Sequence, residues 1–157
     1  MGYTEQLDGL YSRHLMQYVR DFEFKITNKL SQGIGAQIQL KNEDLHIILS
    51  VDRGIPEFEI GPNKKPFQLI STKLLISYFK LKEAANDLSP WARKKIIGSR
   101  LGIEDEITWV FEHYQELLIF FSKSNLNDCI NEMNQLVYEE FKPPSANGTR
   151  LRKKNLK

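Results

Sequence analysis

The residues able to do acid–base, nucleophilic or metal chemistry are few and scattered along this chain. The three histidines, His14, His46 and His113, do not have the close spacing that is typical of metal-binding motifs. Cys129 is the single cysteine, so no disulfide can form within the chain, and no nucleophile signature flanks it. We therefore expect a protein that is not an enzyme and that uses neither a metal nor another cofactor.

Two further groups of residues have a structural explanation as well as a chemical one. Gly33 and Gly35 do not form a phosphate-binding loop, because no Lys-Ser/Thr pair follows them and no helix is predicted there. Glu57 and Glu59 leave one predicted strand on the same side. Glycosidase-type catalysis needs two carboxyl groups that face each other across a cleft, which one strand does not provide. We interpret this pair as a solvated strand face and as a second choice for partner binding.

The predicted helix from Glu104 to Lys123 has an apolar side and an acidic side. The apolar side is formed by Ile103, Ile107, Val110, Phe111, Tyr114, Leu118 and Phe121. Asp105, Glu112 and Glu116 lie opposite, with Trp109 near them. Tryptophan is enriched in binding hot spots, and carboxylates attract basic partners. Either a neighbouring helix covers Trp109, or these four residues form a partner-binding surface.

The segment Lys94–Tyr114 resembles helix-turn-helix DNA-binding segments, with Gly102 at the position of the turn. In that motif the beginning of the second helix enters the major groove beside the phosphates. Here that beginning carries Glu104, Asp105 and Glu106, and phosphates would repel these carboxylates. We therefore do not expect this helix to read nucleic acid.

The stretch Ala36–Pro62 alternates apolar and polar residues and predicts three antiparallel strands. A two-residue turn at Asn42-Glu43 sets the first register, and a turn at Arg53-Gly54 sets the second. The expected apolar pairs are Leu40–Leu45, Ile38–Ile47, Ala36–Leu49, Ile34–Val51, Leu49–Phe58 and Ile47–Ile60. All of them share one face, and the other face is mostly polar. We therefore expect one buried and one solvated face.

The N-terminal segment predicts an amphipathic helix over residues 4–20. Residues 22–30 are ambiguous, because every fourth position continues the helical stripe whereas alternate positions from Phe22 to Ile26 are apolar as in a strand. We favour a single helix that runs to about Leu30, with a strand as the alternative.

Four helices are predicted after the sheet, at about residues 71–86, 91–100, 104–123 and 125–141. The fold class is therefore α+β: an N-terminal helix, a three-stranded antiparallel meander, and a four-helix C-terminal half packed on one sheet face. We expect a single domain over residues 1–142 and a basic, disordered tail over residues 143–157.

Charge is distributed unevenly along the chain. The net charge is +2, and residues 143–157 carry five cationic side chains and no acid, so the rest of the chain carries −3. An acidic body suits a basic partner. The basic segment 91–100 and the tail favour an alternative, a nucleic-acid-associated regulatory protein. The N-terminal residues lack the apolar core of a secretion signal, and we expect a cytoplasmic protein.

The motif Asp52-Arg53-Gly54, followed by EFEIGP at Glu57–Pro62 and a helix from Ser71, resembles small bacterial immunity proteins. Such proteins protect cells from polymorphic or contact-dependent toxins, and the resemblance covers residues 36–80. It implies an N-terminal helix, a short meander and a helical C-terminal half. It also implies a non-enzymatic inhibitor that occludes the active site of one partner toxin, often a nuclease. Binding surfaces diverge within such families, so the resemblance assigns no site residue.

Overall fold

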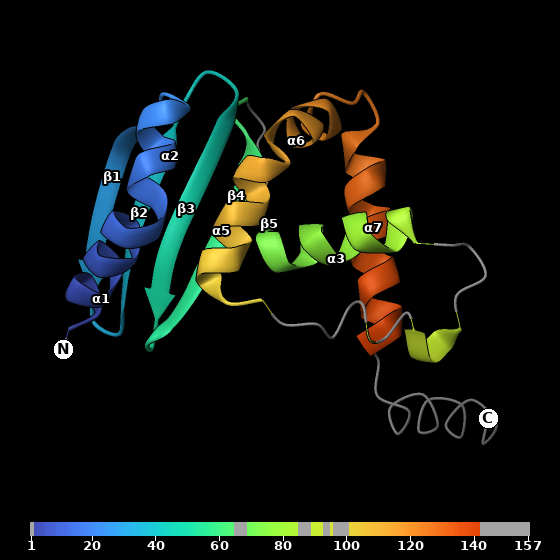
Figure 1. Ribbon diagram of the computed structural model, residues 1–157, viewed down its shortest axis with the longest axis horizontal. Helices are drawn as coiled ribbons and strands as arrows, with labels where there is room; N and C mark the ends of the chain where they lie inside the picture. Colours follow the sequence, from blue (N-terminus) through green and yellow to red (C-terminus); the bar gives the residue numbers. More distant parts are fainter. Residues whose placement is uncertain (1, 65–68, 85–88, 93–94, 96–100, 142–157) are drawn as a thin grey trace, which may run out of the picture.

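The computed structural model describes residues 2–64, 69–84, 89–92, 95 and 101–141, and side chains up to residue 136. The fold is α+β, as predicted, with helices over one face of an antiparallel sheet (Figure 1). In the described residues the sheet has five strands in sequential order: β1 (Lys25–Gln32), β2 (Gly35–Lys41), β3 (Leu45–Asp52), β4 (Ile55–Pro62) and β5 (Ile70–Ser71). The predicted three-stranded meander is β2 to β4, and β1 and β5 extend it.

The N-terminal helical segment lies over β2 and β3 and runs along the strands (Figure 1). It consists of α1 (Tyr3–Leu10), a π-helical turn (Tyr11–Leu15) and α2 (Met16–Asp21). The segment ends where Glu23 adopts a φ of 58° and the N–H of Phe24 donates to the carbonyl of Val19, at 2.9 Å. The chain then enters β1. The preferred prediction of a helix to Leu30 is therefore wrong, and the strand alternative is confirmed.

β1 is an edge strand, and all eight of its residues are exposed. Ile26 and Leu30, which continued the helical stripe in the sequence, are 50% and 39% exposed and lie outside the core. The strand is attached to α1 by an ion pair of 2.7 Å between Lys29 and Asp8. Ile26 and Leu30 therefore match a helical period in the sequence, although they lie on an exposed strand.

The register between β2 and β3 differs from the prediction by two residues. Leu40 lies opposite Ile47 and Ile38 opposite Leu49, so the turn is at residues 43–44 instead of 42–43. The N–H of Asn42 donates to the carbonyl of Leu45 at 3.0 Å and closes this turn. A slip of two residues leaves every side chain on its original face. The predicted buried face is therefore right, although the predicted partners are wrong.

The register between β3 and β4 agrees with the prediction. Leu49 lies opposite Phe58, and Ile47 lies opposite Ile60. The connecting turn is Arg53-Gly54, whose φ angles of 52° and 84° are the positive values that a two-residue hairpin turn requires.

The core lies between the apolar sheet face and the helices. Its fully buried side chains include Leu7, Leu15, Leu40, Leu45, Ile47, Leu49, Phe58, Ile60, Ile107 and Leu117. The opposite face of β2 to β4 is mostly polar and partly exposed, as predicted, but His46 and Ile48 on that face are buried. Burial lowers the pKa of His46, and the charge of Lys41 on the neighbouring strand lowers it further.

The C-terminal half is helical. Its described helices are α3 (Thr72–Glu83), α5 (Ile103–Glu112), α6 (Tyr114–Phe121) and α7 (Leu126–Phe141). The predicted helix 104–123 is broken at His113 into α5 and α6. α5, α6 and α3 all contact β4, whereas α7 packs mainly on α3, so the expectation that all four helices pack on one sheet face is only partly met (Figure 1).

Two sequence predictions fall partly or wholly outside the described residues. Ser89 begins a helix as expected, since its Oγ accepts the N–H of Ala92 at 3.1 Å. Most of the predicted helix 91–100 and the whole of the tail 143–157 lie outside the described ranges. Within those ranges, no helix is both long and apolar enough to cross a membrane.

Candidate functional site

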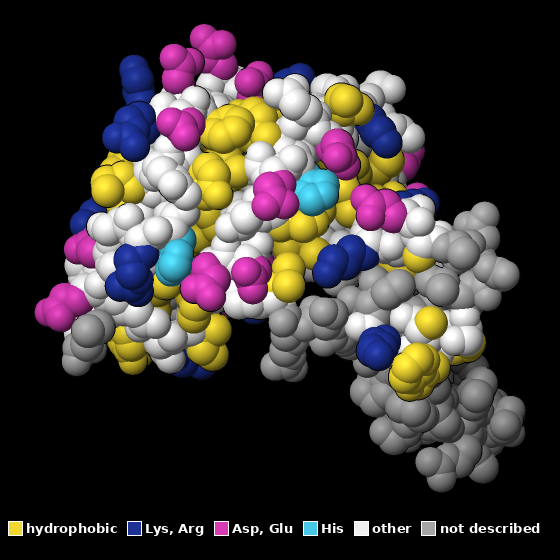
Figure 2. Space-filling model, viewed as in Figure 1, with side chains coloured by type: hydrophobic (Ala, Val, Ile, Leu, Met, Phe, Trp, Pro, Cys, Tyr) yellow, Lys and Arg dark blue, Asp and Glu magenta, His cyan; other side chains and the backbone are white. Residues whose placement is uncertain are grey.

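The acidic side of α5 and α6 lies at the surface. Asp105, Trp109 and Glu112 are spaced i, i+4 and i+7, which places them along one side of α5, and Glu116 follows in the first turn of α6. The three carboxylates are exposed, and Trp109 is partly buried. Figure 2 shows acidic side chains gathered with a histidine over the junction of α5, α6 and α3. We call these four residues the acidic stripe.

Trp109 is held on two sides and reaches the surface. Its ring lies edge-to-face with Phe79 of α3, at 5.4 Å between centroids, and stacks on His113 at 4.3 Å with an interplanar angle of 17°. The sequence left open whether a helix covers Trp109, and α3 covers it in part. A fixed, partly exposed indole offers contact area with little loss of rotamer entropy on binding.

His113 is the residue at which α5 ends and α6 begins. Its Nδ1 lies 2.9 Å from the backbone carbonyl oxygen of Trp109. A carbonyl oxygen only accepts hydrogen bonds, so Nδ1 carries a proton, and in the neutral imidazole the lone pair is on Nε2. The stacking and the hydrogen bond together fix both the plane and the tautomer of this imidazole.

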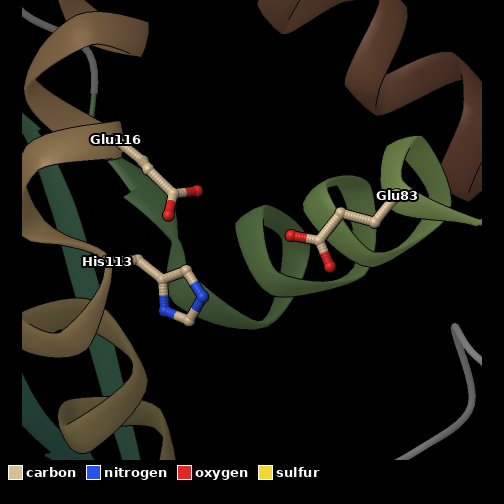
Figure 3. A group of neighbouring side chains, drawn as sticks. All are labelled: Glu83, His113 and Glu116. Carbon is tan, nitrogen blue, oxygen red and sulfur yellow. The ribbon is translucent and has the colours of Figure 1, made fainter.

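Glu83, the last residue of α3, meets the acidic stripe at this point. One donor atom from each of Glu83, His113 and Glu116 lies within 4.8 Å of the other two. Figure 3 shows the two carboxylates converging on the imidazole from α3 and from α6. Glu116 was predicted as a partner-binding residue, His113 was considered as a metal ligand and set aside for its spacing, and Glu83 was not predicted. The i, i+3 spacing of His113 and Glu116 was a local signal, whereas Glu83, thirty residues earlier, had none.

The second-choice residues do not join this surface. Glu57 and Glu59 leave β4 on the face opposite to Phe58 and Ile60. Glu57 is exposed and Glu59 is partly buried. Burial raises the pKa of Glu59, and the neighbouring Glu57 charge raises it further. The two groups of predicted acids therefore lie on different elements, with Glu57 and Glu59 on the polar face of the sheet.

A second aromatic surface lies at Trp91. Its side chain is 71% exposed, the largest value for a large apolar residue in the described part of the chain. The Nζ of Lys95 lies 5.0 Å from the centroid of its ring, within cation–π range. Lys94 and Arg100 belong to the same basic segment 91–100, on which the nucleic-acid alternative rests, and lie outside the described residues.

Glu106 is the one buried acid among the described residues, at 1% exposure, on the inner side of α5. Thr72 Oγ1 contacts Oε1 of Glu106 and also lies 3.1 Å from the carbonyl oxygen of Phe58. The two acceptors compete for the one hydroxyl proton of Thr72, and a protonated Glu106 that donates to Oγ1 would leave this proton for the carbonyl of Phe58. Burial raises the pKa of Glu106 above its ordinary value and outweighs the hydrogen bond with Thr72, which lowers it.

We predict that Glu106 makes folding stability fall as the pH rises. A carboxyl group whose pKa is raised in the folded state stabilises the fold fully below its unfolded pKa, and that contribution is lost as the pH rises through the folded-state pKa. Glu106→Gln mimics the protonated acid. In urea denaturation, the free energy of unfolding of the variant should therefore rise relative to that of the wild type as the pH increases from 4 to 8.

Asp105→Asn, at the adjacent exposed position, is the control and should show little of this pH-dependent gain. A difference between Glu106→Gln and wild type that stays constant across this pH range would contradict a protonated Glu106 in the folded state.

Comparison of the chain with known proteins found no relative. No protein-family model matches it, and no curated protein or solved structure gives a significant match. Function is therefore inferred from the geometry of the acidic stripe and its neighbours.

Proposed function

We propose that this protein is a non-enzymatic inhibitor of the immunity type, which binds a partner toxin and occludes its active site. The observation that carries the proposal is the acidic stripe, where a fixed and partly exposed Trp109 stands among exposed carboxylates. An aromatic anchor surrounded by charge is the usual composition of a binding hot spot and its rim. The resemblance of residues 36–80 to immunity proteins supports the same proposal.

The charge of this surface suits a nuclease. A nuclease cleft that binds phosphates is basic, and an acidic surface accelerates association with such a cleft and competes with its substrate. Glu112 and Glu116 on the stripe and Glu83 beside it are exposed, so they can reach the cations of a partner.

A neighbouring depression offers room for a wider contact. It has a volume of about 330 Å³ and lies between α6 and the turn that joins β2 and β3. Glu43 and Asp44 line it on the turn, and Ile119 of α6, which is 64% exposed, lines it on the helix. Lys64 also lines the depression, which therefore carries two acids, one cation and an exposed apolar side chain.

The proposal is tested by co-expression in bacteria. The partner tested first is the C-terminal domain encoded by the neighbouring reading frame, and the readout is growth. We expect the wild-type chain and Trp91→Ala to restore growth, and the double charge reversal Glu112→Lys/Glu116→Lys to fail. Both reversed side chains are exposed, so the fold should survive. If the double reversal still protects fully, the acidic stripe is not the surface that binds the toxin.

The alternative is a nucleic-acid-associated regulator, and the exposed Trp91 beside Lys95 favours it, because aromatic and cationic side chains together bind bases and phosphates. Binding of random DNA and RNA is measured at increasing salt. Strong, salt-sensitive binding that Trp91→Ala abolishes would support the regulator and count against occlusion. We expect the chain to bind neither polymer tightly.

A further inference from the structure

The Glu83–His113–Glu116 cluster has the composition of a metal site. It offers two carboxylates and one imidazole from two separate parts of the chain, with donor atoms within 4.8 Å of one another. Donor atoms around a tetrahedral zinc ion with bonds of about 2.0–2.2 Å lie roughly 3.3 Å apart. Glu83 and Glu116 are exposed, so small side-chain rotations can close the remaining gap.

The imidazole of His113 is held in the way that metal-ligating histidines are held. Such histidines donate their other ring N–H to a carbonyl or carboxylate, which fixes the ring and its tautomer. Here Nδ1 donates to the carbonyl of Trp109, and the indole of Trp109 stacks on the ring. In Figure 3 the other ring nitrogen points toward the carboxylate of Glu83. The hydrogen bond and the stacking that hold the His113 ring do not involve either of the two acids.

In the part of the chain that the structure describes, neither carboxylate forms an ion pair with a lysine or an arginine. Among the described residues, the ion pairs join His14 to Glu104, Lys29 to Asp8 and Lys82 to Glu132, and none includes Glu83 or Glu116. Lys82, next to Glu83 in sequence, lies 2.5 Å from Glu132 instead. A divalent cation between the two carboxylates would neutralise their repulsion.

We propose that Glu83, His113 and Glu116 bind a divalent transition-metal ion, with zinc as the best fit. An imidazole ligand favours zinc over magnesium or calcium, which prefer sites built from oxygen alone. Three protein ligands leave a fourth position for water or for a group from a partner. The ion would join the end of α3 to the junction of α5 and α6. This inference does not depend on the immunity function, because the chain alone supplies the ligands.

The test is a zinc titration of the untagged full chain by calorimetry. We expect one ion per chain. Glu83→Gln, His113→Gln and Glu116→Gln should each weaken binding by at least about tenfold, the smallest loss typical of changes around a metal site. The control is His14→Gln, because His14 lies 3.5 Å from a single carboxylate, that of Glu104, and should bind zinc as the wild type does. Circular dichroism checks the fold of each variant.

A second readout places the ion beside Trp109. Trp91→Phe leaves Trp109 as the single tryptophan. Cobalt bound at His113, whose ring stacks on Trp109, should quench that fluorescence, and His113→Gln should abolish the quenching. Three results would each overturn the proposal. They are no zinc binding at millimolar concentration, zinc affinity unchanged in the three variants, and a sulfur-to-cobalt absorption band that assigns binding to Cys129.

Discussion

Asn42→Ala is expected to lower the free energy of unfolding by about 2–4 kcal/mol. The side chain of Asn42 makes four hydrogen bonds. Its Nδ2 donates to the carbonyl of Phe22 at 3.0 Å and to the hydroxyl of Tyr114 at 2.7 Å. Its Oδ1 accepts the N–H groups of Asp44 and Leu45 at 2.9 and 2.8 Å. One side chain therefore ties the turn between β2 and β3 to the end of the N-terminal helical segment and to α6.

Urea denaturation measures this loss. Asn42→Asp keeps the two acceptor bonds and removes the two donor bonds, so it should also destabilise the fold. Asn134→Ala, at an exposed position of α7, is the matched control and should change the stability by less than about 0.5 kcal/mol. An Asn42→Ala variant as stable as this control would show that the turn is held by its backbone alone.

Trp109→Ala is expected to weaken binding of the toxin partner by more than about 30-fold, or about 2 kcal/mol, which is the loss that defines a hot spot. The reason is that Trp109 is the rigid apolar group of the acidic stripe. Calorimetry with the partner found by co-expression measures the effect. Trp91→Ala removes the other tryptophan, which is 71% exposed, and should leave the affinity unchanged.

Removing Trp109 also removes its contact with Phe79, so a fall in stability has to be separated from a loss of contact. Glu112→Gln with Glu116→Gln provides the separation, because both side chains are exposed. This variant should slow association and flatten its salt dependence without changing stability. An unchanged affinity in a folded Trp109→Ala variant would place the partner elsewhere.

The sequence was sufficient to predict which face of the sheet is buried, but not to predict the register of every strand pair. Arg53-Gly54 permitted one pairing of β3 with β4, and the structure has that pairing. Between β2 and β3 the alternation of apolar residues was compatible with two turns, since a slip of two residues keeps every face. The side chain of Asn42 selects the later turn through its bonds to Asp44 and Leu45, and periodicity does not record such bonds.

The end of the N-terminal helical segment was not readable from local signals. The chain leaves the helix at Glu23, which takes a positive φ without a glycine or proline to mark the break. Ile26 and Leu30 kept the helical period although both are exposed on β1. Residues 25–32 instead form a hairpin with β2 through the turn at Gly33, and this strand pairing overrides the helical period.

The candidate site was partly readable. Asp105, Glu112 and Glu116 are exposed as the helical period predicted, and Trp109 is partly so. The contribution of α3 was not readable, because the positions of Phe79 and Glu83 depend on how α3 packs against α5. A surface built from two elements becomes visible only when their packing is known.

The central claim is that the acidic stripe is the surface that contacts the partner. Amide hydrogen exchange of the chain, alone and in complex with the toxin domain, tests it most directly. We predict that protection on binding is concentrated in the end of α3 and in α5 and α6. Protection concentrated in β1, or on the polar sheet face that carries Glu57 and Glu59, with α5 and α6 unchanged, would contradict the claim.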